Sequence, residues 1–165
     1  MIKRAFTLVE VLIVVAILGI LAAIVIPHFQ SQSQDAKEAA AKDNLRILRN
    51  AIEIYSSQHN DTPPGYDING NITASFYFEA QLTAYTNSQG LASETKSENF
   101  RYGPYLSDLP VNPFNQKSYF WIFDDATPLP DNASGSFGWI YKPATRTVKL
   151  DAAGTDSEGT PYYDY

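Results

Sequence analysis

Glu10 is the first candidate functional residue, because its carboxylate lies at the edge of a long apolar run. Residues 11–26 follow it without a charged or strongly polar side chain. A carboxylate inside an apolar span is costly and usually has a partner. The alternative is that Glu10 lies close enough to the membrane interface to reach water. The chemistry that Glu10 offers is therefore charge pairing.

A second candidate is an acidic, glycine-containing segment, residues 151–159, which carries Asp151, Asp156 and Glu158. Hard cations such as Ca²⁺ bind several oxygen atoms from carboxylates and carbonyls on flexible loops. The spacing is not that of an EF-hand, so Ser118 or a backbone carbonyl would have to supply a further ligand. A calcium site and a solvated acidic loop both remain open.

Little in the sequence suggests an enzyme. There is no Cys, so thiol nucleophiles, thiolate metal sites and disulfides are excluded. The two His residues, His28 and His59, lie far apart along one expected helix, and no phosphate-binding loop or triad motif is present. The net charge of −6 also argues against nucleic-acid binding, which relies on Lys and Arg.

The apolar run predicts a membrane-spanning helix over residues 6–27. Residues 6–26 would form roughly 31 Å of helix, which matches the thickness of the bilayer core. Lys3 and Arg4 precede the run and favour a cytoplasmic N-terminus, so the rest of the chain should lie outside the cytoplasm. Gly19 and Pro27 are expected to weaken or kink this helix.

Beyond the apolar run the sequence predicts that the helix continues, in amphipathic form, to about residue 58. One apolar stripe recurs at helical spacing and is suited to docking a head domain. Its members are Ala41, Leu45, Leu48, Ile52 and Tyr55. Ile47, Ala51 and Ile54 are expected to widen this stripe. The segment NDTPPG, residues 60–65, ends the helix.

The remaining residues predict a small head. A short helix is expected over residues 76–85, and strands are expected at residues 118–123, 137–141 and 147–151, with a turn at 142–145. Three strands alone are marginal, but they can close a core when they pack on the stripe of a helix. We therefore predict an α+β fold in which a long N-terminal helix packs on a three-stranded antiparallel sheet.

The segment KRAFTLVE, residues 3–10, resembles the class III signal of type IV prepilins and type II secretion pseudopilins. The resemblance implies that a prepilin peptidase removes a leader, residues 1–5, by cutting between Ala5 and Phe6, and that the new amine is methylated. It also implies that Glu10 pairs with the N-terminal amine of a neighbouring subunit. Ala5 departs from the family pattern, which usually has Gly there.

Gly19 and Pro27 fall where this family commonly has helix-weakening residues. The resemblance divides the chain into the leader, a transmembrane and filament-core helix over residues 6–27, and an amphipathic helix with a globular head over residues 28–165. Residues 103–115 and 138–145 resemble the corresponding segments of major pseudopilins more loosely. The acidic segment with Asp151, Asp156 and Glu158 resembles their calcium loop in position and composition.

The resemblance implies a structural subunit of a type IV pilus or a type II secretion pseudopilus. Its expected partners are other copies of the chain, the prepilin peptidase, an inner-membrane assembly platform, minor pilins or pseudopilins, and membrane lipid before assembly. The subunit would lie in the inner membrane before assembly, and in the periplasm or at the cell surface afterwards. A singly anchored adhesin module and a minor subunit at a filament tip are the alternatives.

Overall fold

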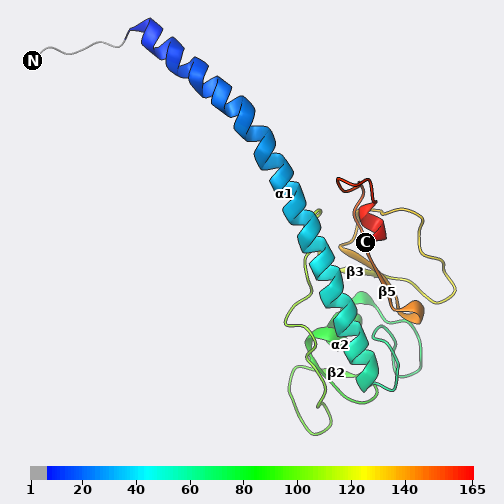
Figure 1. The fold of residues 1–165 in the computed structure, drawn as a ribbon. Coiled ribbons are helices and arrows are strands. Elements are labelled where there is room, and N and C mark those ends of the chain that lie inside the picture. Colours follow the sequence, from blue (N-terminus) through cyan, green and yellow to red (C-terminus); the bar gives the residue numbers. More distant parts are fainter. Residues whose placement is uncertain (1–6) are drawn as a thin grey trace, which may run out of the picture. The chain divides into compact units, whose positions relative to one another are not determined.

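The computed structural model describes residues 7–165, except for the side chains of residues 24–31. The chain divides into two compact units, Met1–Lys37 and Glu38–Tyr165. Helix α1 (Leu8–Gln58) contributes to both units, and all strands found within residues 7–165 belong to the second (Figure 1). The predicted α+β class is confirmed.

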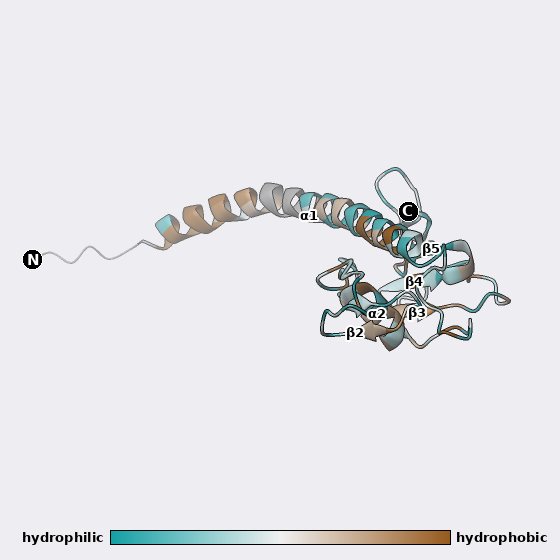
Figure 2. Cartoon of the chain, turned by 90° about the horizontal axis from the view of Figure 1, so that it is seen from below, coloured by the Kyte–Doolittle hydropathy of each residue, from teal (hydrophilic) through white to brown (hydrophobic). Residues whose placement is uncertain are grey.

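The described part of the first unit consists mainly of the N-terminal portion of α1, which is apolar over residues 11–23 (Figure 2). The large apolar side chains from Leu8 to Leu21 are 50–82% exposed. Among the described residues, no helix has both the length and the apolar character needed to cross a membrane.

The second unit begins with the amphipathic part of α1. The predicted stripe is buried, with Leu48 and Ile52 fully enclosed, and Ala51 joins it. The expectation that Ile47 and Ile54 widen the stripe was wrong, because they are 38% and 50% exposed. The head therefore covers a narrower face of the helix than the sequence predicted, and the two isoleucines remain on the surface.

The main sheet has three strands in the order β3–β4–β5. They are β3 (Phe120–Ile122), β4 (Trp139–Lys142) and β5 (Thr147–Leu150). Strands β4 and β5 pair antiparallel across a short 3₁₀ turn, η1 (Pro143–Thr145), which ends at Arg146 with φ of 52°. This turn lies where the sequence predicted one.

The prediction of an all-antiparallel sheet was wrong, because β3 and β4 run parallel and the sheet is mixed. The cause is the connection between them, residues 123–138. A two-residue turn would have made a hairpin, whereas a connection of a dozen or more residues can carry the chain back to the same end of the sheet.

A second, smaller group of elements completes the head. Helix α2 (Ser75–Thr83) confirms the predicted short helix, and it is followed by an antiparallel pair, β1 (Tyr85–Thr86) and β2 (Ala92–Ser93). The polar segment after Thr86, for which the sequence predicts no regular structure, thus contains a two-residue strand. This strand is too short for periodicity to reveal it.

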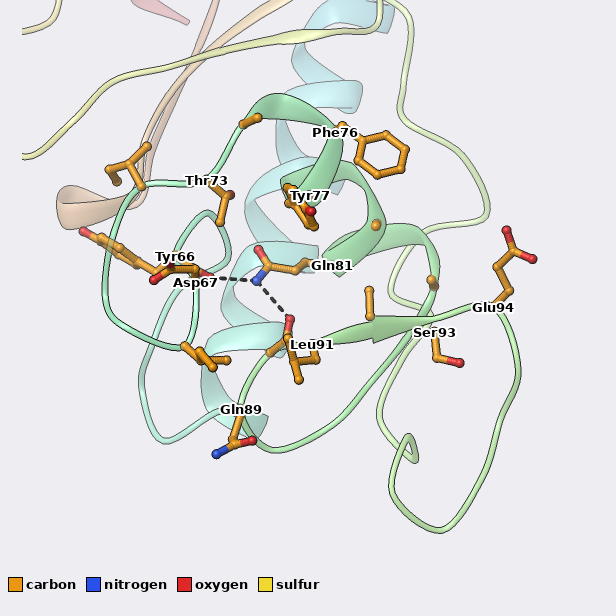
Figure 3. A pocket seen from close by; sticks show the side chains of 17 residues that line it. Tyr66, Asp67, Thr73, Phe76, Tyr77, Gln81, Gln89, Leu91, Ser93 and Glu94 are labelled. Carbon is orange, nitrogen blue, oxygen red and sulfur yellow. Dashed lines mark hydrogen bonds between the residues drawn. The ribbon is translucent and has the colours of Figure 1, made fainter.

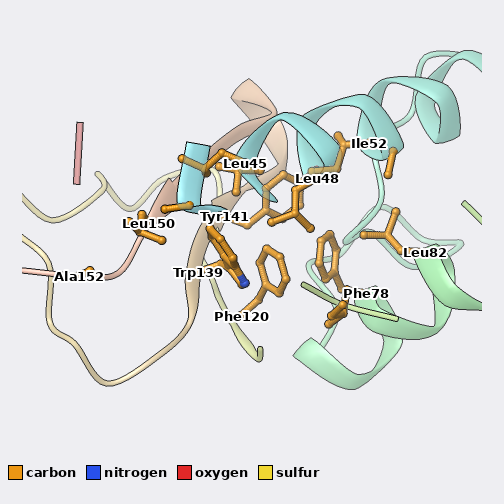
Figure 4. Packing of buried hydrophobic residues seen from close by; sticks show 14 of the residues in the cluster. Leu45, Leu48, Ile52, Phe78, Leu82, Phe120, Trp139, Tyr141, Leu150 and Ala152 are labelled. Atoms are coloured by element: carbon orange, nitrogen blue, oxygen red, sulfur yellow. The ribbon is translucent and has the colours of Figure 1, made fainter. Parts of the chain in front are cut away.

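The core lies between α1, α2 and the sheet (Figure 4). Leu45, Leu48 and Ile52 from α1 belong to one buried cluster with Phe120, Trp139 and Tyr141 of the sheet. The rings of Phe78 and Tyr141 lie 4.8 Å apart between their centroids. Aromatic side chains supply large apolar area, which suits a small head that lacks disulfides.

The last turn, η2 (Tyr162–Asp164), fastens onto α1. The Tyr162 hydroxyl donates to Glu38 at 3.0 Å, and Arg49 donates to the carbonyl oxygen of Tyr165 at 2.7 Å. Lys42 lies 4.3 Å from the centre of the Tyr165 ring. Residues more than a hundred positions apart in the sequence thus hold each other in place.

Candidate assembly surface and acidic loops

Glu10 forms a reciprocal capping box with Thr7 at the start of α1. The backbone N–H and the hydroxyl of Thr7 each donate to Oε2 of Glu10 at 3.1 Å. The backbone N–H of Glu10 in turn donates to the Thr7 hydroxyl at 3.2 Å. This exchange satisfies two donors that have no partner within the helix. The carboxylate also lies at the helix N-terminus, where the helix dipole favours negative charge.

The capping box uses only one of the two carboxylate oxygens of Glu10, Oε2. Among residues 7–165, no hydrogen bond reaches Oε1 of Glu10, and the residue is exposed. One oxygen therefore fixes the side chain while the other faces outward. This arrangement suits a second, intermolecular donor.

The apolar side chains after Glu10 form the most extensive exposed apolar surface in the described part of the chain. Soluble monomers rarely expose apolar patches of more than a few hundred Å², and larger ones mark sites of protein or membrane interaction. The surface runs around the helix rather than along one stripe, since successive residues from Val11 to Val15 are all exposed. Such a helix is suited to being surrounded by apolar neighbours.

Several predicted site residues lie at or beyond the limits of the described structure. Ala5 and Phe6 lie outside the described residues, as do Lys3 and Arg4. Pro27 lies among the residues whose side chains are not described, although α1 is continuous across it. A Cβ atom added at Gly19 would meet nothing within 4 Å, so no neighbour within the subunit requires glycine there.

Asp151 follows β5 and is fully buried. Its Oδ1 accepts hydrogen bonds from the backbone N–H groups of Ser134 and Gly135, at 2.6 and 2.9 Å. Its Oδ2 accepts from the Ser134 hydroxyl at 2.7 Å and from the backbone N–H of Phe137 at 2.9 Å. Burial would raise the pKa of Asp151, but these four donors outweigh it and hold the pKa below its ordinary value.

Asp156 closes the next loop in a similar way. Its Oδ1 accepts from the backbone N–H groups of Glu158 and Thr160, at 3.0 and 2.8 Å, and its Oδ2 accepts from the Tyr165 hydroxyl at 3.0 Å. Lys42 lies 3.7 Å from Oδ2. Burial would raise the pKa of Asp156, and the donors and Lys42 lower it below its ordinary value.

The three acids predicted as calcium ligands are not brought together as a set. Glu158 is exposed, and no group of three acidic or His side chains suited to a metal ion occurs within the described residues. Calcium binding by Asp151, Asp156 and Glu158 stays a prediction. Whether a cation can bind there depends on the N–H and O–H groups that already donate hydrogen bonds to the two aspartates.

Acid should destabilise the head through these two aspartates. An aspartate whose pKa is lower in the folded than in the unfolded chain stabilises the fold fully above its unfolded pKa, which is about 3.9. That stabilisation is lost as the pH falls through the folded pKa. We expect the urea midpoint to be constant from pH 7 to 5 and to fall below pH 4. Asp151→Asn should flatten this fall, and an equally steep fall in that variant would contradict the assignment.

A separate hollow of about 650 Å³ lies beside α2. The buried amide of Gln81 holds its wall together: it accepts from the N–H of Gly65 at 2.7 Å and donates to the carbonyls of Tyr66 and Gly90 at 2.9 and 3.1 Å (Figure 3). Exposed apolar side chains border the hollow. They are Ile68, Phe76, Tyr77 and Leu91.

His59 has a structural position. It is 3% exposed, its ring stacks on Tyr55 with centroids 3.9 Å apart, and its Nδ1 donates to the Tyr55 carbonyl at 2.7 Å. A carbonyl can only accept, so Nδ1 carries the proton in this arrangement. The His59 ring thus satisfies a carbonyl near the end of α1 and packs against Tyr55.

Sequence reasoning missed two sets of residues. Thr7 could have been found, because Thr-x-x-Glu before an apolar run is the sequence signature of a capping box. The donors to Asp151 had no such signal. Ser134, Gly135 and Phe137 meet the carboxylate only because the long connection between β3 and β4 folds back past the end of β5.

Comparison with known proteins gives a consistent result. Residues 1–26 match the family model described as the prokaryotic N-terminal methylation motif. The chain is 32% identical to the type II secretion system core protein G of Aeromonas hydrophila, over 94% of this chain and 90% of that protein. It is 32% identical to the Vibrio cholerae protein of the same description, over 76% of this chain and 75% of that protein.

Similarity to pilins is more local. The chain is 49% identical to the type IV major pilin protein PilA of Myxococcus xanthus over 56 residues, which are 34% of this chain and 26% of that protein. No solved structure matches the chain at a significant level.

Proposed function

Because the chain belongs to the family of type II secretion system core protein G, we propose that it is a structural filament subunit, most closely a pseudopilin of type II secretion. The observation that carries this proposal is the methylation motif over residues 1–26, followed by an exposed apolar helix surface. Similarity to core protein G extends over almost the whole chain, which favours a pseudopilus. A type IV pilus is the second candidate, supported by the local identity with a major pilin. The role is structural rather than enzymatic.

The N-terminal helix has two successive environments in this proposal. Before assembly, residues 6–27 anchor the subunit in the inner membrane, with residues 28–165 outside the cytoplasm. During assembly, apolar helices of neighbouring copies replace lipid. Lipid tails are as apolar as leucine, so this exchange gains little from the hydrophobic effect and depends on packing and on polar contacts.

Glu10 supplies the directional contact. Thr7 holds Oε2 of Glu10, which leaves Oε1 for the methylated amine of Phe6 in a neighbouring copy. In a dry core, a carboxylate and an amine attract each other far more strongly than in water, but each also loses its hydration. The pair therefore selects the register between subunits more than it stabilises the filament.

The proposed partners follow from this cycle. A prepilin peptidase exposes the amine of Phe6, an inner-membrane platform extracts the subunit, and minor pseudopilins or pilins share the filament. The subunit moves from the inner membrane to the periplasm in a pseudopilus, or to the cell surface in a pilus. A tip subunit is disfavoured, because such subunits often lack the glutamate that this chain has at position 10.

The mature chain should begin at Phe6. Intact-mass measurement of the protein from its native host should show the loss of Met1–Ala5 and the gain of one methyl group, because the proposed amine exists only after cleavage. As a control, the same protein made in cells that lack a prepilin peptidase should keep its leader. A native mass that retains Met1 would contradict the proposed processing.

A further inference from the structure

Asp151 occupies the segment that resembles a calcium loop, yet its surroundings differ from those of a cation site. We propose that the Asp151 carboxylate itself holds the end of β5 to residues 134–137, in place of a bound calcium ion. The head then folds without a divalent cation. This role of Asp151 lies within the head and does not depend on filament formation.

The carboxylate has no acceptor site left for a cation. An ionised carboxylate offers about four lone-pair sites on its two oxygens. Asp151 accepts four hydrogen bonds, two on each oxygen, from Ser134, Gly135 and Phe137. Calcium requires six to eight oxygens at about 2.3–2.6 Å. To approach Asp151, the ion would have to displace donors whose positive ends already point at these oxygens.

The backbone oxygen of Asp151 is also taken. The side-chain amides of Asn112 and Asn115 donate to it, at 3.4 and 3.0 Å. The same amides donate to the carbonyls of Gly138 and Phe137, at 2.9 and 2.6 Å. Three segments of the head therefore meet at Asp151, and the carbonyls that could have ligated an ion accept from amides instead.

The neighbouring acids do not replace the missing ligands. Three N–H or O–H donors occupy Asp156, and Lys42 adds a positive charge beside it. Glu158 is exposed and contributes its backbone N–H, rather than its carboxylate, to this loop. Neither acid adds an open oxygen to a site around Asp151.

A buried anion needs compensation, and here N–H dipoles provide it. No Lys, Arg or His within the described residues forms an ion pair with Asp151. Several backbone N–H groups that converge on one anion form a concave site that stabilises negative charge. The anion in this site is the Asp151 side chain itself, so residues 134–137 can close on it during folding without an added ion.

The test is the thermal stability of the full-length protein in detergent, measured by circular dichroism in millimolar calcium and in excess chelator. We expect the same melting temperature in both. A calcium ion bound to the folded state at a hundredfold excess over its dissociation constant would raise the melting temperature by several degrees. A rise of that size in the wild-type protein would overturn the proposal.

Variants distinguish a carboxylate that accepts hydrogen bonds from one that binds calcium. Asp151→Asn keeps the shape but places an NH₂ group against N–H donors, and it should lower the melting temperature by the same large amount in calcium and in chelator. Ser134→Ala removes one of the four donors and should have a smaller effect, while exposed Asp131→Asn is the matched control and should have none. If Asp151 were a calcium ligand, the gap between Asp151→Asn and wild type would vanish in chelator.

Discussion

Replacing Glu10 with alanine is expected to impair filament formation strongly while the subunit still folds and inserts into the membrane. Among the described residues, the side chain of Glu10 hydrogen-bonds with Thr7 of the same helix end, so the stability of the head should not change. Assembly should fall by at least tenfold, because a lost charge pair in a dry core leaves the partner amine unpaired. Electron microscopy of sheared filaments, with immunoblots of total and membrane-bound subunit, measures both outcomes.

Alanine also removes the capping box, so a second variant is needed to isolate the charge. Glu10→Gln keeps the capping box, since glutamine also serves at this position, but it removes the negative charge. We expect it to impair assembly about as strongly as Glu10→Ala. Asp35→Ala, an exposed acid on the same helix, is the matched control. Wild-type filament numbers with Glu10→Gln would leave helix capping as the only role of Glu10.

The largest effect on folding is expected from Gly138→Ala. A Cβ atom at this position would lie 2.8 Å from the carbonyl carbon of Lys117, and closer still to its oxygen. Both atoms belong to the backbone that leads into β3, and Gly138 donates to the carbonyl of Tyr119 at 3.0 Å, so neither side can move without breaking the parallel pairing. We expect a loss of about 3 kcal/mol in the free energy of unfolding.

Urea denaturation of the full-length protein in detergent measures this loss. Gly135→Ala is a suitable control: its φ is +68°, but a Cβ atom there would meet nothing within 4 Å. It should therefore cost only the strain of a left-handed alanine, about 1 kcal/mol. Equal losses in the two variants would show that close backbone approach at Gly138 does not limit stability.

Local patterns in the sequence were enough to predict the parts of the fold that depend on neighbouring residues. The stripe from Ala41 to Tyr55 repeats at helical spacing and was confirmed, and the short helix expected over residues 76–85 was found at Ser75–Thr83. The direction of β3 relative to β4 was predicted wrongly, because it depends on where a long connection returns. No periodicity in that connection records its path.

The same distinction applies to the site residues. Glu10 could be identified because a carboxylate beside an apolar run is conspicuous, and Thr7 was readable from its spacing to Glu10 although it was missed. Asp151 was also identified, but with a cation as its expected partner. Its actual partners are backbone N–H groups of residues 134–137, which look like any other backbone in a sequence.

The fastening of η2 onto α1 has a consequence for the order of events during synthesis. The contacts of Tyr162 with Glu38 and of Tyr165 with Arg49 span 124 and 116 positions of sequence. Contacts between residues so far apart form late, because the entropy of closing the intervening loop must be overcome first. A ribosome therefore releases nearly the whole chain before the head can close, while the apolar helix has long since emerged. The subunit would be anchored in the membrane before its head folds. In the interval, the aromatic residues of the future core would be exposed to chaperones.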